Sequence, residues 1–169
     1  MTALAVRSLQ AFAPAPRKVE YGHAIQRAGD WLVLAQPRST EDHAFQLLGL
    51  HWAGAPLTAI RTAADRLIAL QRSDGGWGQI PTLASDAYAT GQALIALAEA
   101  GVVKPSHPVY KKGVWFLLGT QLADGSWHVQ SRAVPLQPYF NSKFPHAADQ
   151  FISAAATNWA TMALVFAAR

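Results

Sequence analysis

The sequence has no cysteine, and charged residues make up only 14% of its 169 residues. Without thiols the chain has no disulfide, no catalytic thiolate and no cysteine ligand for zinc. The low charge, together with a 51% share of hydrophobic residues, is typical of a globular protein with a sizeable core. We therefore expect a single domain over residues 1–169.

Runs of basic residues are also absent, although the formal net charge is +4. Lysine and arginine occur singly or in pairs, without interleaved stacking residues, so no nucleic-acid partner is predicted. The run 152–168 contains Thr157 and Asn158 and falls short of the roughly 18 residues of a spanning helix. We expect a buried core helix there and no transmembrane segment. Arg7 interrupts the first apolar stretch, which argues against a signal peptide in this chain.

Two kinds of helix are predicted to alternate along the chain. Segments 20–36, 57–71 and 107–121 have one apolar face; in 57–71, Ile60 and Leu67 lie on that face and Arg61 lies elsewhere. Segments 44–55, 87–101 and 152–168 are apolar nearly all round and rich in small residues, so protein should surround them. This alternation predicts an all-α fold with two concentric layers, an α/α toroid.

Helix boundaries are signalled by capping residues. Ser39 or Thr40, just before two acidic residues, suits a helix start, and so does Ser85-Asp86. Gly54 and Gly101 suit helix ends.

An internal repeat supports the layered fold. AIQRAGDWLVLAQ at 24–36 matches AIRTAADRLIALQ at 59–71, and a third copy at 109–121 again ends on glutamine. After two of these glutamines the same turn follows, QRSDGGW at 71–77 and QLADGSW at 121–127. Residues 1–13 look like the end of an inner helix that lacks its outer partner. The repeats therefore predict about three and a half helical hairpins, a partial barrel of inner and outer helices.

The spacing Q-x-x-D-G-[GS]-W resembles the QW motif of squalene–hopene cyclases and oxidosqualene cyclases, in the wider superfamily that includes protein prenyltransferases. Its residues here are Gln71, Asp74, Gly75, Trp77, Gln121, Asp124, Gly125 and Trp127. Asp-Gly suits a tight turn, the glutamine amide can satisfy backbone groups at helix ends, and the tryptophan can cover the turn. These roles are structural, so the motif alone predicts no catalysis.

The resemblance covers almost the whole chain and implies the C-terminal part of a terpenoid-cyclase-like toroid. An arc of this length would leave apolar inner helices exposed at its ends. Missing N-terminal repeats, a second copy in a homodimer, or another chain must then complete it. The stretch 131–164 is also similar to bacterial proteins built on squalene-cyclase-like repeats, so the expectation is a soluble bacterial protein, with its compartment left open.

The acidic motifs of these families, D-x-D-D and D-D-x-x-D, do not occur in the sequence. The zinc site of protein prenyltransferases cannot be carried over without its cysteine. No metal and no cofactor are therefore predicted. The resemblance transfers the fold but not an active site, and whether the chain is an enzyme stays open.

The candidate catalytic residues are Asp86 and Asp149, which are predicted with Asp42 at the N-termini of inner helices. They either cap these helices or form an acidic rim that meets a ligand. The long loop 128–149, which contains Pro135, either recognises a ligand or only plugs the toroid. Trp159 either lines an aromatic cavity or packs in the core. Candidate ligand-binding residues are Tyr88, His128, Arg132, Tyr139, His146 and Trp159.

Three functions fit these features. The first is a toroid module that binds an apolar, isoprenoid-like ligand or a partner chain and performs no chemistry alone. The second is a fragment of an isoprenoid cyclase or transferase that uses an inner-helix aspartate. The third is a scaffold whose loop recognises protein or glycan. Fold resemblance does not choose among them.

Overall fold

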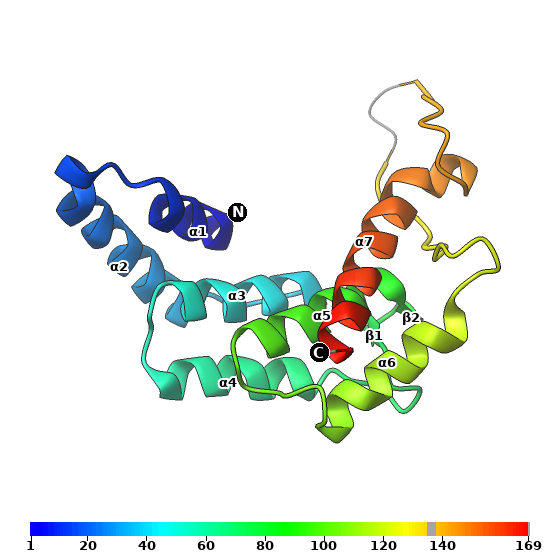
Figure 1. Ribbon diagram of the computed structural model, residues 1–169, viewed down its shortest axis with the longest axis horizontal. Coiled ribbons are helices and arrows are strands. Elements are labelled where there is room, and N and C mark those ends of the chain that lie inside the picture. The colour runs from blue at the N-terminus through cyan, green and yellow to red at the C-terminus, as the bar shows by residue number, and fades with distance from the viewer. Residues whose placement is uncertain (135–137, 169) are drawn as a thin grey trace.

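The computed structural model describes residues 1–134 and 138–168, and this part of the chain is mostly helical (Figure 1). The fold is all-α, as predicted, and no described helix combines the length and apolarity needed to cross a membrane. The helices are α1 (Thr2–Phe12), α2 (Lys18–Leu34), α3 (Thr40–Trp52), α4 (Leu57–Ile68), α5 (Ala87–Glu99), α6 (Pro108–Thr120) and α7 (Gln150–Ala167). Two 3-10 turns, η1 (Ala15–Arg17) and η2 (Ala147–Asp149), precede α2 and α7, and β1 (Trp77–Gly78) pairs with β2 (Ser85–Asp86).

Local capping determines where α3 and α5 begin and end. The Ser39 hydroxyl accepts the backbone N–H of Asp42, and the Asp42 carboxylate accepts the N–H of Ser39, which completes a capping box. Asp86 caps α5 by accepting the N–H of Ala89 at 2.8 Å. Gly54 and Gly101 follow the two helices with φ of 67° and 68°, a conformation that glycine adopts without strain. These predicted boundaries are confirmed.

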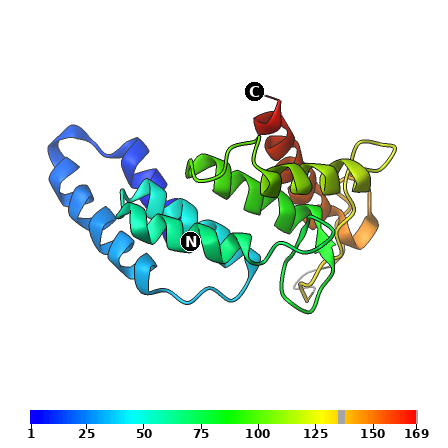
Figure 2. The same ribbon diagram turned by 90° about the horizontal axis from the view of Figure 1, so that it is seen from below.

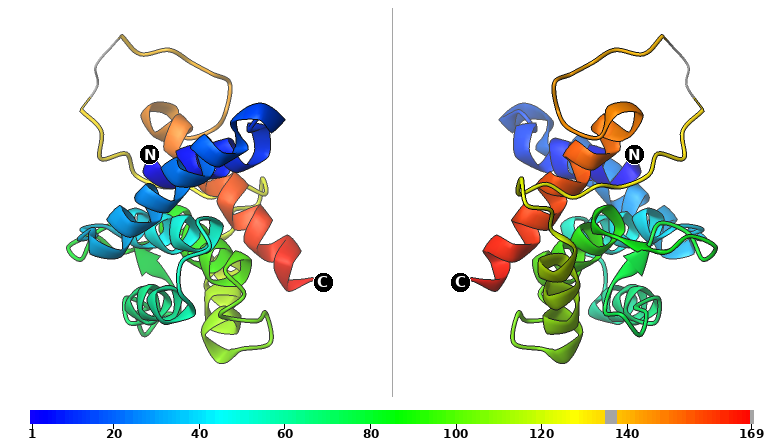
Figure 3. Two further views of the ribbon diagram at one scale, coloured as in Figure 1. Left: turned by 90° about the vertical axis from the view of Figure 1, so that its left-hand side faces the viewer. Right: turned by 90° about the vertical axis from the view of Figure 1, so that its right-hand side faces the viewer.

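The helices form two layers. Helices α1, α3, α5 and α7 pack successively into one row, α1 on α3, α3 on α5 and α5 on α7. Helices α2, α4 and α6 pack against this row, α2 on α1 and α3, α4 on α3, and α6 on α5 and α7. Figures 2 and 3 show this arrangement from below and from two sides. We call the row α1, α3, α5 and α7 the inner row and the other three helices the outer helices. Helices α3, α5 and α7 correspond to the three predicted all-apolar segments, and α1 is the segment that was predicted to end an inner helix.

Glycine allows close packing within the inner row. A Cβ atom on Gly49 would lie 2.6 Å from Leu32 Cδ1 and 2.9 Å from Ala3 Cβ, so this residue permits α1 to lie against α3. A Cβ on Gly91 would lie 2.6 Å from the backbone carbon of Trp159, so only glycine permits α5 and α7 to meet at this distance. Small residues thus decide how near the inner helices come to one another.

Helix α7 differs from its prediction, because it is not surrounded by protein. Its buried residues form one stripe, Gln150, Ser153, Ala156, Ala160 and Ala163. On its other face Phe151, Met162 and Val165 are 57%, 43% and 48% exposed. The physical reason is position, since α7 ends the row and packs chiefly against α5, with α6 beside it.

A matched pair of substitutions tests the close packing. Gly91→Ala should destabilise the fold by about 1–3 kcal/mol, because the new methyl group meets the backbone of α7. Gly22→Ala, inside α2 with nothing within 4 Å of the new Cβ, should stabilise it by about 0.5–1 kcal/mol through helix propensity. Urea unfolding followed by circular dichroism measures both. A gain in stability at Gly91 would show that α5 and α7 are not in close contact.

Candidate functional site

The two Gln-to-Trp turns have the same internal hydrogen bonds. Gln71 Nε2 donates to the carbonyl of Gly75 at 2.9 Å, and Gln121 Nε2 donates to that of Gly125 at 3.0 Å. The glycines have φ of 86° and 82°, which explains the requirement for Asp-Gly. Both turns thus follow one hydrogen-bonding plan, and Gln71 adds a second bond, to the carbonyl of Val109 at 2.8 Å.

Each tryptophan then connects an outer helix to the next inner one. The indole N–H of Trp77 donates to the carbonyl of Leu67 in α4, and that of Trp127 donates to Leu117 in α6. The backbone N–H of Trp77 donates to Thr90 Oγ1 in α5, whereas that of Trp127 donates to Thr157 Oγ1 in α7. Both rings are buried, so these bonds satisfy polar groups that water cannot reach.

In both turns a serine hydroxyl donates to the aspartate of the turn, although the serine lies at a different sequence position in each. Asp74 Oδ1 accepts the N–H of Gly76 and the hydroxyl of Ser85 from β2. Asp124 Oδ1 accepts both the N–H and the hydroxyl of Ser126, which occupies the position of Gly76. A Cβ on Gly76 would lie 2.7 Å from Ser85 Cβ, so the β1–β2 pairing excludes a side chain there. After Trp127 the chain continues into a long loop, so the second turn has room for the side chain of Ser126.

The candidate site lies at the N-terminal ends of α3, α5 and α7, where the segment 128–149 joins α7 (Figures 1 and 3). Arg132 Nε donates to Gln79 Oε1 at 2.7 Å, and Gln79 Nε2 donates to Asp86 Oδ2 at 3.0 Å. The backbone N–H of Thr40 donates to the carbonyl of Gln79, and its hydroxyl donates to Gly78. These bonds tie α3, the start of α5 and the long loop together.

An open pocket of about 390 Å³ lies over this junction, and we call it the rim pocket. Its lining is Glu41, Gln79, Tyr88, Ser131, Arg132, Ala133, Phe151, Ile152 and Ala155. One side is polar and carries both a carboxylate and a guanidinium, whereas the α7 side is apolar. The rim pocket therefore suits a molecule with a polar group joined to an apolar body.

Two acidic groups at this rim are shifted toward their neutral forms. Burial raises the pKa of Asp86, although the N–H of Ala89, the amide of Gln79 and the nearby charge of Arg132 oppose the rise. Burial also raises the pKa of the Tyr88 hydroxyl, and the neighbouring Glu41 carboxylate raises it further. Tyr88 therefore stays a neutral hydroxyl that donates or accepts hydrogen bonds at neutral pH.

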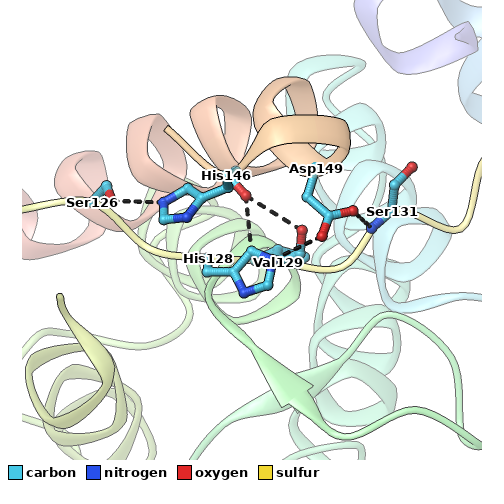
Figure 4. A network of polar contacts seen from close by, with 7 residues as sticks. Ser126, His128, Val129, Ser131, His146 and Asp149 are labelled. Carbon is cyan, nitrogen blue, oxygen red and sulfur yellow. Dashed lines mark hydrogen bonds and ion pairs between the residues drawn. The ribbon is translucent and has the colours of Figure 1, made fainter. Parts of the chain in front are cut away.

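A second cluster surrounds Asp149 (Figure 4). His128 Nε2 lies 2.8 Å from Asp149 Oδ2, and the N–H of Ser131 donates to Asp149 Oδ1 at 2.8 Å. His146 Nε2 lies 2.8 Å from Ser126 Oγ, and the two imidazole rings stack with centroids 5.0 Å apart. The cluster ties both ends of the long loop to the second Gln-to-Trp turn.

Asp149 lies at the N-terminus of α7, as predicted, but of the two alternatives for its side chain the capping bond is not formed. Its carboxylate makes no capping bond and binds Ser131 and His128 instead. The short turn η2 comes before α7 and places the carboxylate over the loop. The backbone N–H of Ser131 and the His128 ring hold the pKa of Asp149 below its usual range.

The returning half of the loop is held by Gln150, a buried residue at the start of α7. Its side-chain oxygen accepts the N–H and hydroxyl of Ser142, and its amide donates to the carbonyl of Phe140 at 2.6 Å. Lys143 and His146 adopt positive φ of 71° and 82°, which is uncommon for non-glycine residues. The side-chain contacts of Gln150 and His146 hold the loop in this conformation, although residues other than glycine prefer negative φ.

The structure brings only some of the candidate residues together. Tyr88 and Arg132 line the rim pocket, with Asp86 behind them. His128, His146 and Asp149 share the second cluster. Trp159 lies deeper on α7, edge-on to Phe45 with ring centroids 6.3 Å apart, whereas Tyr139 is 63% exposed. Pro135 lies outside the described residues, and among those described no group of three or more His, Asp or Glu side chains is placed to hold a metal ion.

Two residues that hold the rim and the returning half of the loop were not predicted from the sequence. Gln79 joins Arg132 to Asp86, and Gln150 anchors the loop. A glutamine directly before an apolar residue, Ile80 or Phe151, was the available signal in both cases. It shows that a buried amide needs partners, but it does not say which residues provide them.

The lowered pKa of Asp149 predicts a pH-dependent loss of stability. Because the folded state holds the carboxylate ionised, its contribution is present above the ordinary carboxyl pKa and disappears as pH falls through the lowered one. Asp149→Asn should therefore destabilise the protein by roughly 1 kcal/mol at pH 7, and the difference from wild type should shrink toward pH 3. Urea unfolding at pH 7, 5 and 3 measures this.

The control is Asp30→Asn, on the exposed surface of α2. Its effect should stay within about 0.3 kcal/mol of zero throughout this pH range, as for a surface substitution away from special contacts. A pH-independent effect of Asp149→Asn would mean that the charge of Asp149 does not stabilise the loop.

No protein-family model matches the chain. The squalene–hopene cyclase of Bradyrhizobium diazoefficiens is 39% identical over 85 aligned residues, which cover 42% of this chain and 12% of that protein. The chain therefore matches only a small part of the length of this relative. The match supports a distant relationship to squalene–hopene cyclases and agrees with a terpenoid-cyclase-like helical module.

Proposed function

We propose that this chain is a terpenoid-cyclase-like helical module that binds an apolar, isoprenoid-like ligand. In this proposal the row α1, α3, α5 and α7 is part of a ring, and for the isolated chain a second copy completes it. The module binds and encloses its ligand and performs no chemistry alone.

The observation that carries the proposal is the apolar surface at both ends of the inner row. At one end Phe151, Met162 and Val165 of α7 are largely exposed, and at the other end Leu4 and Phe12 of α1 are 45% and 82% exposed. Inner helices with exposed apolar faces are expected in an incomplete ring but not in a complete monomer. Further protein with a matching face would remove this surface from water.

The rim pocket supplies the proposed ligand site. Phe151 belongs both to the pocket lining and to the exposed face of α7, so an apolar ligand in the pocket would continue along that face. Tyr88 and Arg132 stand at its polar side and would hold a polar end group of the ligand. The loop residues Ser131 and Ala133 form the outer wall.

A second function, in which Asp86 is a general acid, is supported by its raised pKa. An acid that keeps its proton can protonate an alkene or a leaving group. However, Asp86 also caps α5 and accepts a bond from Gln79, so its lone pairs are engaged. The test is turnover of an isoprenoid substrate by wild type, Asp86→Asn and Asp149→Asn. If wild type turns the substrate over and both variants do so at the same rate, this function is ruled out.

Native mass spectrometry of the freshly purified chain tests assembly and ligand together. The expected result is a dimer that retains a small apolar molecule. The double variant Met162→Glu, Val165→Glu should give a monomer without that molecule, because charges on the α7 face oppose its burial.

The control is Leu57→Glu, which changes a 56% exposed apolar residue on the outer helix α4. This variant should remain a dimer and retain the ligand. A wild-type monomer without any bound molecule would refute the proposal, as would a dimer that both the α7 variant and the control leave unchanged.

A further inference from the structure

A second pocket lies on the other side of the junction between α3 and β1. Its volume is about 480 Å³, and we call it the arginine pocket. Its lining is Pro37, Arg38, Ser39, Thr40, His43, Ala69, Leu70, Gln71, Arg72, Gly78, Ile80 and Pro81. The hydrogen bonds from Thr40 to Gly78 and Gln79 separate it from the rim pocket, to which Glu41 and Gln79 belong.

The arginine pocket contains positive charge without a carboxylate in its lining. Arg38 and Arg72 both line it, and neither forms an ion pair with any described residue. Asp42 accepts the backbone N–H groups of Arg38 and Ser39 and does not line this pocket, although it lines a neighbouring pocket together with Arg38. Two arginines thus line one pocket, and neither has an ion-pair partner among the described residues.

The hydrogen-bonding capacity of this pocket is also incompletely used. Arg72 donates through one nitrogen to the carbonyls of Ile80 and Pro81, at 3.3 and 3.1 Å, which holds the side chain in place. The side chain of Arg38 has no hydrogen-bond partner among the described residues. His43 lines the same pocket, and its buried Nδ1 has no partner in the described part of the chain.

The remaining walls are apolar. Pro37, Leu70 and Pro81 contribute them, together with Ala69 and Ile80. A bare inorganic ion would leave this part of the pocket unfilled. A molecule with a charged head and a small organic body would use both parts.

We infer that the arginine pocket binds the phosphate group of a small organic phosphate, with Arg38 and Arg72 on the phosphate oxygens and the organic part against Pro37, Leu70 and Pro81. Each guanidinium group can bind phosphate oxygens through a pair of N–H donors. The two positive charges of Arg38 and Arg72 together match the charge of a dianion. This site is independent of the ligand proposed for the rim pocket.

The imidazole of His43 provides a local readout. Burial lowers the pKa of His43, and the nearby charge of Arg66 lowers it further, whereas Asp42 opposes the shift. A dianion beside His43, Arg38 and Arg72 would favour the protonated ring. Bound phosphate should therefore move the pKa of His43 upward, and NMR titration of its ring protons measures the change.

Calorimetric titration with phenyl phosphate, and with benzoate as its singly charged analogue, tests the chemistry of the site. Phenyl phosphate should bind at least about tenfold more tightly than benzoate and raise the pKa of His43. Arg38→Gln should weaken phenyl phosphate binding at least about tenfold, the loss expected for one charge-assisted hydrogen bond. Helicity and melting temperature should remain those of wild type, because Arg38 makes no side-chain bond that folding requires.

The matched control is Arg61→Gln, an exposed arginine of α4 that does not line the pocket. It should change the affinity less than about twofold, because solvent and salt screen an exposed charge that lies away from the pocket. Equal losses from Arg38→Gln and Arg61→Gln would show unspecific attraction to a basic chain and overturn the inference. So would equal affinity for benzoate, or an unchanged pKa of His43 at saturating phenyl phosphate.

Discussion

The two-layer structure depends on hydrogen bonds that side-chain N–H groups donate to carbonyls near the C-terminal ends of the outer helices. In α4 and α6 the indole N–H groups of Trp77 and Trp127 bind the carbonyls of Leu67 and Leu117. The outer helix α2 has no such tryptophan, and there Gln46 of the next inner helix donates to the carbonyl of Leu32 at 2.7 Å. Different residues thus make the same kind of link between the layers, and each such hydrogen bond contributes about 0.5–1.5 kcal/mol.

The backbone N–H of each tryptophan is bound to a threonine hydroxyl of the next inner helix. The chain between these two bonded residues can therefore differ in length. In the first turn the tryptophan N–H and its threonine hydroxyl are 13 residues apart, and in the second they are 30 apart. The longer segment forms the loop that contains Arg132, His128 and His146. The loop side of the candidate site is therefore a longer chain segment between two fixed points, held by Gln79 at one end and Gln150 at the other.

Much of the fold was predictable because its causes are local. The capping box at Ser39 and the cap at Asp86 act within four residues of chain, and a glycine at a helix end needs no distant partner. The site was less predictable. Tyr88 and Arg132, which were candidates from an inner helix and from the long loop, line one pocket, and no sequence pattern had joined them. Asp149 has the same type of sequence context as Asp86, but its side chain makes no capping bond. Its carboxylate instead binds Ser131 and His128, which lie 18 and 21 residues earlier in the sequence.

The sequence by itself determined the helices, their alternation of one-faced and all-apolar character, and the two Gln-to-Trp turns, since each follows from short-range periodicity, capping and turn chemistry. The tertiary structure alone decided which face of α7 is buried and which charges share a pocket. Glu41 and His43 are two residues apart on α3, yet one lines the rim pocket and the other the arginine pocket. Such a division depends on which distant segments lie on each side of a helix, and no local pattern contains that information.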